Sequence, residues 1–289
     1  MEKPKTFIHQ WPGGISTLAG GTRRAIKLNR PWQKQLNTDH TTCPFEPSRL
    51  EDEGRQITGR SSDGRWVSFD NYFTPNLDHS LVIPATCQDW PDARVRLLGG
   101  KEEIVSALDL IYKLLETKPK HQTTEIIINI GWLGGQNVSH IHWHVFGLPV
   151  GAVNGSSDQI ATSLGQLNNP DLALFERNGL EVVVGGHRAG QCFILPKEKN
   201  ISIQNIATVI ADLVALYADK FKSSVGEQLA PDFTIGLVHN EGNFVYGTYV
   251  PILNNWGGFE SLAFLGQQAV SLPWPHEQTA AYLRGENFS

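Results

Sequence analysis

Apolar and polar residues follow the same order twice along this chain. In the first pass, an apolar strand that ends on proline, residues 80–84, precedes an amphipathic helix over residues 101–116. Two β-rich runs, residues 125–129 and 140–146, complete the pass. The pattern predicts a strand–helix–strand–strand unit.

The second pass repeats that order. Its segments are a strand that again ends on proline, a helix and two strands, over residues 191–196, 203–221, 233–238 and 244–251. Small polar residues and glycine concentrate near residues 154–177, as expected for a boundary loop. We therefore predict an α+β fold with a duplicated unit, in which residues 1–165 form an N-terminal arm plus the first half and residues 166–289 the second half.

Three histidines, His140, His142 and His144, alternate with apolar residues in the last strand of the first pass. Side chains two apart in a strand point the same way, so the imidazoles would line one surface while the apolar residues face the core. The glycine-rich segment just upstream suits phosphate oxygens. Imidazoles beside it suggest chemistry on phosphorus, although a row of histidines also suits a metal ion.

The size, charge and cysteine content of the chain narrow the classes of protein to which it can belong. The chain of 289 residues is long enough for one large domain or two modest ones. Its formal charge of -5 argues against a nucleic-acid polymer as the main partner. With no apolar run long enough for a bilayer and no signal-peptide pattern, we expect a cytoplasmic protein without membrane contact. Three cysteines cannot all pair and indicate no disulfide framework.

The histidine motif resembles the signature of the histidine-triad (HIT) superfamily of nucleotide hydrolases and transferases. The matching elements are Asn129-Ile130-Gly131, the Gly134-Gly135-Gln136 turn and His140-Ile141-His142-Trp143-His144. The chain is most similar to the double-domain branch that includes galactose-1-phosphate uridylyltransferase and the dinucleoside polyphosphate phosphorylases. The resemblance implies antiparallel sheets, flanking helices and pseudo-two-fold halves. The second half is degenerate, because it offers Val245, Gly247 and Tyr249, or their neighbours, where the first has histidines.

The resemblance implies a role for each histidine. His142 would attack the nucleotide α-phosphate and form a covalent intermediate, and the His140 backbone carbonyl would hold its ring in the reactive tautomer. His144 would contact phosphate oxygens or the bridging oxygen. The nearest relatives typically have glutamine at this third position, whereas the hydrolases have histidine, which can protonate a leaving group. Hydrolysis therefore stays an alternative to transfer.

Further positions match family sites for nucleotide and metal. The predicted nucleotide and phosphate contacts are Asn71, Asn129, Gly135, Gln136 and Asn137, and each could instead be a turn or strand-end residue. The predicted ligands of a structural zinc ion are Cys43, Glu46, Cys87 and His140. Two isolated cysteines in partly buried loops are the alternative, and Cys192 is expected in the core.

A segment near the C-terminus resembles the family's acceptor site. Gly258, Phe259 and Glu260 would hold the sugar of a sugar phosphate in the partner subunit's active site, which implies a homodimer. Glu260 could instead cap a helix. The seven other histidines have no spacing that indicates a role: His9, His40, His79, His121, His187, His239 and His276.

Together these features favour an enzyme of the nucleotidyltransferase or phosphorylase type. It would form nucleotidyl-His142 and transfer the nucleotide to or from a phosphate-bearing acceptor, for example a sugar phosphate. The alternatives are a HIT-type nucleotide hydrolase and a nucleotide-binding protein without turnover. The sequence leaves the base, the acceptor and the oligomeric state open.

Overall fold

The computed structural model describes most of both predicted halves. The described residues are 6–11, 14–19, 43, 45–52, 54–71, 78–86, 100–117, 123–131, 136, 140–148, 167–186, 188, 190–221, 231–252 and 275–286. Within them, ten strands join in one antiparallel sheet, and β1 (Thr6–Trp11) pairs with β2 (Gly14–Ala19) in a separate hairpin. The mixed α+β class predicted from the sequence is confirmed.

The first half contributes five neighbouring strands to the sheet. From the edge inward they are β3 (Ile57–Arg60), β4 (Trp66–Asp70), β5 (Asp78–Pro84), β7 (Trp143–Leu148) and β6 (Thr123–Ile130). Helix α3 (Lys101–Thr117) connects β5 to β6, and the short α1 (Pro47–Asp52) precedes β3.

The second half repeats this order from the opposite edge. Its strands are β8 (Ala173–Arg177), β9 (Leu180–Val184), β10 (Cys192–Pro196), β12 (Asn243–Pro251) and β11 (Phe233–Asn240). Helix α5 (Ile203–Lys220) connects β10 to β11, as α3 connects β5 to β6. The 3-10 turn η2 (Pro170–Leu172) precedes β8, and α7 (His276–Arg284) packs against β8 and β9.

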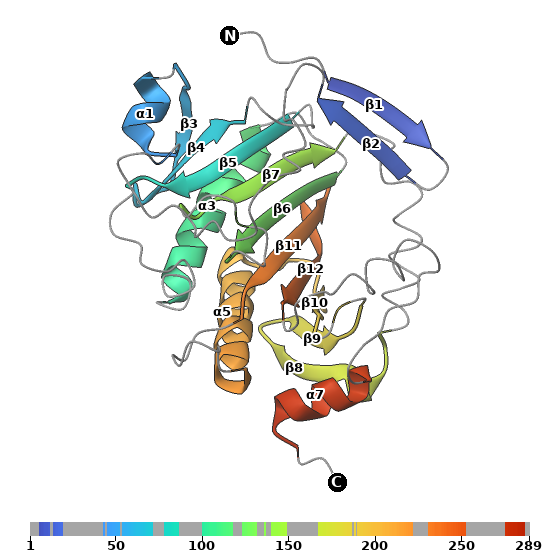
Figure 1. Cartoon of the computed structure of the whole chain (residues 1–289). Coiled ribbons are helices and arrows are strands. Elements are labelled where there is room, and N and C mark those ends of the chain that lie inside the picture. The colour runs from blue at the N-terminus through green and yellow to red at the C-terminus, as the bar shows by residue number, and fades with distance from the viewer. Residues whose placement is uncertain are drawn as a thin grey trace, which may run out of the picture.

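The two halves meet at β6 and β11, which pair antiparallel from Thr123 opposite Asn240 to Ile130 opposite Phe233. Because the strand order reads the same from both edges to this seam, the predicted duplication with pseudo-two-fold halves is confirmed. The halves share one continuous sheet, and α3 and α5 pack side by side against it (Figure 1). The predicted boundary at residues 165 and 166 lies outside the described residues.

The pattern of buried residues explains this layering. Alternate residues of β6, Ile126, Ile128 and Ile130, are fully buried, as a strand with one face on the core requires. Burying each such side chain stabilises the fold by roughly 1.5–3 kcal/mol. The hydrogen-bonded register places Trp143, Ile128, Ile235 and Tyr249 in one row across four strands, with all four side chains buried in the same core cluster. The opposite face of the sheet is therefore the one that can carry polar chemistry.

The sequence pattern missed the strands at both edges of the sheet and helix α7. These strands are only four or five residues long, too short for a clear period. The turn between β8 and β9 did carry a signal, because Asn178 and Gly179 have φ of 55° and 73°, and an Asn-Gly pair favours such a hairpin turn. No helix among the described residues is both long and apolar enough to cross a membrane.

Candidate functional site

The histidine triad lies beside the middle of the first half, where β7 pairs with β5 and β6. Ile141, Trp143 and Val145 are at most 1% exposed and belong to the core. His144 therefore points away from the helices, and the ring of His142 lies beside it at a centroid distance of 4.9 Å. Only His144 lies within β7, which begins one residue earlier, so the prediction of a strand over all three histidines was wrong.

His142 is oriented by the backbone of the first histidine. Its Nδ1 donates to the carbonyl oxygen of His140 at 2.8 Å. His140 lies outside strand β7, and its carbonyl oxygen accepts from an imidazole. A neutral imidazole with its proton on Nδ1 keeps a lone pair on Nε2. Burial lowers the pKa of His142, and the bond to the His140 carbonyl opposes that shift. The ring is thus held as a neutral imidazole, and it meets the ring of Phe45 in a T-shaped arrangement at a centroid distance of 5.1 Å.

The structure brings together two of the predicted metal ligands. Cys43 Sγ lies 3.3 Å from His140 Nδ1, although the residues are 97 positions apart in the sequence. In a tetrahedral zinc site, sulfur and nitrogen ligands at normal bond lengths are about 3.6 Å apart, so the donor pair fits the ion. Glu46 does not join them, because the described residues contain no cluster of three potential ligands. Cys87 lies outside the described residues.

Two residues of the predicted phosphate-binding segment, Asn129 and Gln136, form hydrogen bonds that hold the segment to the sheet. Asn129 Oδ1 accepts a hydrogen bond from Thr234 Oγ1 of the second half at 3.0 Å. Gln136 is buried and closes the glycine loop, since its Oε1 accepts from the Gly131 N–H at 2.8 Å while its own N–H donates to the Gly131 carbonyl at 3.1 Å. Gly135 and Asn137 lie outside the described residues.

A fourth histidine, to which the sequence analysis gave no role, completes the site. His79 Nε2 lies 3.0 Å from His144 Nδ1, and its Nδ1 lies 3.1 Å from the amide nitrogen of Asn71. The His79 ring stacks on Phe146 at 4.1 Å, because the two residues are direct partners in the pairing of β5 with β7. The signal that could have found it is its place directly before the predicted proline-terminated strand, because the duplicated topology puts that strand, β5 in the structure, next to the triad strand.

The degenerate half has no imidazole at the matching positions. Cross-strand pairing runs from His144 through Ile127 and Gly236 to Thr248, and such partners point to the same face of a sheet. Tyr249 points to the helix face and is fully buried. The face of His144 thus continues onto Thr248, a neighbour of the Gly247 and Tyr249 named from the sequence.

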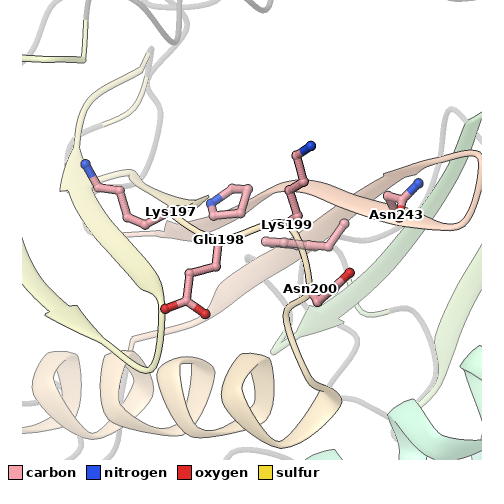
Figure 2. A pocket seen from close by; sticks show the side chains of 7 residues that line it. Lys197, Glu198, Lys199, Asn200 and Asn243 are labelled. Atoms are coloured by element: carbon pink, nitrogen blue, oxygen red, sulfur yellow. The ribbon is translucent and has the colours of Figure 1, made fainter.

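The second half also carries a cavity of about 530 Å³ at the end of β10 (Figure 2). It is lined by Pro196, Lys197, Glu198, Lys199, Asn200, Asn243 and Phe244. Lys197 is paired with Glu181 at 2.6 Å, and the lining holds neither an imidazole nor a thiol. This cavity therefore does not extend the chemistry of the triad. The predicted acceptor residues Gly258, Phe259 and Glu260 lie outside the described residues.

Comparison with known families agrees with this geometry. Residues 63–149 match the family model of the HIT domain. The match covers the β4–β7 segment with the triad and His79, and it confirms the resemblance drawn from the histidine motif. No curated protein matches the chain in sequence.

Solved structures share the fold over almost the whole chain. One described as a uridylyltransferase has a TM-score of 0.64 at 15% identity, covering 96% of this chain and 97% of its own. An ADP-glucose phosphorylase from Arabidopsis thaliana, with bound ADP-glucose, has a TM-score of 0.61 at 15% identity and covers 99% and 100%. A GalT-like protein from Arabidopsis thaliana has a TM-score of 0.59 at 16% identity and covers 86% and 93%. At this identity the likeness establishes the fold.

Proposed function

We propose that this protein is a nucleotidyltransferase or phosphorylase that works through a covalent nucleotidyl-His142 intermediate and moves a nucleotide to or from a phosphate-bearing acceptor, for example a sugar phosphate. The observation that carries the proposal is the bond from His142 Nδ1 to the His140 carbonyl, which leaves Nε2 as the nucleophilic nitrogen. The names of two structural neighbours, a uridylyltransferase and an ADP-glucose phosphorylase, support this class of reaction.

The proposed reaction is two displacements at one phosphorus atom. His142 Nε2 attacks the α-phosphorus, a P–N bond forms, and the bond to the leaving phosphate oxygen breaks with its electron pair. The proton on Nδ1 stays on the ring and keeps its bond to the His140 carbonyl. A phosphate oxygen of the acceptor then attacks phosphorus, and the P–N bond returns its electron pair to Nε2. Both leaving groups depart without needing a proton.

Hydrolysis is the second candidate, because position 144 holds a histidine next to His79. In that reaction, water replaces the acceptor phosphate in the second displacement. The two candidates share the first half-reaction and differ only in what accepts the nucleotide from His142.

We also propose a structural zinc ion held by Cys43, Cys87 and His140, without Glu46, which does not lie with Cys43 and His140. The 3.3 Å approach of Cys43 Sγ to His140 Nδ1 supports it. A zinc ion bound by these residues would stabilise the local structure around Cys43 and His140. His140 would then be fixed at its ring while its carbonyl orients His142. A homodimer with Glu260 at the partner's acceptor site is part of the same proposal.

The test is a two-stage incubation. The protein is first mixed with a panel of labelled nucleoside diphosphate sugars and dinucleoside polyphosphates, and then with inorganic phosphate, a sugar phosphate or buffer alone. Transfer predicts that label reaches the phosphate compounds and that initial rates follow ping-pong kinetics. Equal release of label in buffer alone identifies the hydrolase. Nucleotide binding without release or labelling of the protein would contradict both enzymes.

A further inference from the structure

The third histidine of the triad is held through two side chains that lie outside the triad. Asn71 Nδ2 is 3.1 Å from His79 Nδ1, and His79 Nε2 is 3.0 Å from His144 Nδ1. His79 is only 6% exposed, and Phe146 stacks on both imidazoles, with centroids 4.1 Å from His79 and 5.6 Å from His144. The planes of both rings are thereby fixed.

Asn71, His79 and His144 form a series of hydrogen bonds, and the amide of Asn71 decides which atom donates and which accepts in each of them. An amide nitrogen can only donate, so His79 Nδ1 accepts the bond from Asn71 and carries a lone pair. The proton of a neutral His79 is therefore on Nε2, where it is donated to His144 Nδ1. His144 in turn carries its own proton on Nε2.

We propose that Asn71 is a positioning residue that, through His79, holds His144 as a neutral imidazole with its proton on Nε2, so that His144 donates a hydrogen bond to an oxygen of the phosphoryl group attached to His142. Only the identity of that phosphoryl group rests on the proposed function. The rings of His142 and His144 are 4.9 Å apart. They are set in opposite tautomers, because His142 keeps its proton on Nδ1 and its lone pair on Nε2. One ring attacks phosphorus and its neighbour holds a phosphoryl oxygen.

The same series of hydrogen bonds opposes a role for His144 as an acid. A second proton on His144 Nδ1 would remove the acceptor of the His79 bond. His79 would then have to move its proton to Nδ1, where it would face the N–H group of Asn71. Two donors cannot share one hydrogen bond, so one of the two links would break whichever ring nitrogen of His79 carries the proton. This arrangement suits a leaving group that departs as phosphate and needs no proton.

The tautomers can be measured in the full-length protein without any nucleotide. With ¹⁵N-histidine labelling, long-range ¹H–¹⁵N spectra separate protonated from unprotonated ring nitrogens, and single-histidine variants assign the signals. We expect protons on Nε2 of His79 and His144 and on Nδ1 of His142. Asn71→Leu removes the donor and should give mixed tautomers in His79 and His144. Asn71→Asp replaces the donor by an acceptor and should place a proton on His79 Nδ1.

Both variants keep the backbone bond from the Asn71 N–H to the His79 carbonyl at 2.8 Å, so the local fold is expected to persist. Asn205→Asp is the matched control, because Asn205 also donates through its side chain, to the Asn178 carbonyl in the second half. It should leave all three triad signals unchanged. A wild-type proton on His79 Nδ1, or wild-type signals in both Asn71 variants, would overturn the proposal.

Activity gives a second readout. Glutamine offers an N–H close to the position of imidazole Nε2 but cannot act as an acid. His144→Gln should therefore keep the rate of His142 nucleotidylation within about tenfold, while His144→Ala should lose about a hundredfold or more. Equal losses in the two variants would refute the donor role of His144. A wild-type protein that never becomes nucleotidylated would refute the proposed function, while the tautomers would still be decided by the spectra.

Discussion

At the scale of single residues, the site works through pairs in which one side chain fixes another. The His140 carbonyl fixes the His142 ring, and Cys43 lies against the ring of His140. None of these links needs a charged group. The residue types and their spacing could be predicted from the sequence, because three alternating histidines after a glycine loop are specific. His79 was harder to select, since its partner His144 is 65 positions away in the sequence and the pairing of β5 with β7 brings them together.

Single cysteine variants test the proposed zinc ion. Protein purified without added metal should contain about one zinc per chain, because thiolate and imidazole donors prefer this ion. Cys43→Ser should lose most of the zinc and lower the melting temperature, whereas Cys192→Ser should keep it, since Cys192 is buried beside Tyr217. Elemental analysis of the three proteins decides the matter. Less than a tenth of an equivalent of zinc in the wild type would rule out a structural ion.

At the scale of elements, two strand ends depend on glycine. Gly131 ends the β6 region with φ of 80°, and a Cβ there would lie 2.1 Å from the side chain of Asp232. Gly64, in the turn before β4, has φ of 72°, but a Cβ added there would meet no described atom within 4 Å. An alanine at Gly64 would therefore cause backbone strain alone, whereas an alanine at Gly131 would cause backbone strain and a steric clash.

Gly64→Ala should lower the free energy of unfolding by about 1–2 kcal/mol, the cost of a left-handed alanine. Gly131→Ala should cost clearly more, because Asp232 must move as well. It should also weaken nucleotide binding, since Gly131 anchors the Gln136 loop through two hydrogen bonds. Urea unfolding of both variants measures the difference. An equal decrease in the free energy of unfolding of the two variants would show that the side chain of Asp232 moves aside without an energetic cost.

A buried pair links helix α3 to strand β11. The Tyr112 hydroxyl is hydrogen-bonded to His239 Nε2 at 2.6 Å, and burial lowers the pKa of His239 to about 4. Between pH 6.5 and about 4 the unfolded chain binds a proton that the folded chain excludes. Stability from this site is therefore complete above pH 6.5 and falls as the pH drops, by on the order of 3 kcal/mol.

The double variant Tyr112→Phe with His239→Leu removes both polar groups together and leaves neither one unpaired. Its free energy of unfolding should depend less on pH between 6.5 and 4 than that of the wild type. Chemical denaturation at a series of pH values gives both curves. Parallel curves would mean that His239 titrates normally in the folded state.

The helices were predicted correctly from the sequence because their apolar residues recur with a helical period over a long segment. Helices α3 and α5 begin at the predicted residues 101 and 203 and end within one residue of the predicted positions. Each carries an apolar face over four turns or more, so packing reinforces the local signal. The edge strands could not be predicted, because β3 and β8 bury few side chains and are held by pairing with β4 and β9. Their partners are known only once the sheet is assembled.

At the scale of the whole molecule, the seam between β6 and β11 makes one structural body of the two halves. Leu237 lies opposite Ile126 at the centre of the seam, and both are fully buried. The side chain of Asn129 in the first half accepts a hydrogen bond from Thr234 across the same seam. The second half has no histidines at the positions that match the triad, and it supports the first half through this contact.

Leu237→Ala tests this coupling. The cavity should cost about 2–5 kcal/mol. Because the sheet is continuous, unfolding should remain one transition, with tryptophan fluorescence and far-ultraviolet circular dichroism still coinciding. Thr208→Ala, on the outer surface of α5, serves as control with little change. Two separated transitions would show that the halves unfold independently.

Intact-protein mass measurement shows directly whether His142 Nε2 becomes nucleotidylated. After mixing with a nucleotide donor and rapid quenching in base, the wild type should gain the mass of one nucleoside monophosphate group. Mild acid or the phosphate-bearing acceptor should remove this mass, because a phosphoramidate is labile to acid and is the intermediate of the transfer. His142→Gly should gain nothing while keeping its fold. Turnover by the wild type without such an adduct under quenching, or undiminished turnover by His142→Gly, would contradict the account.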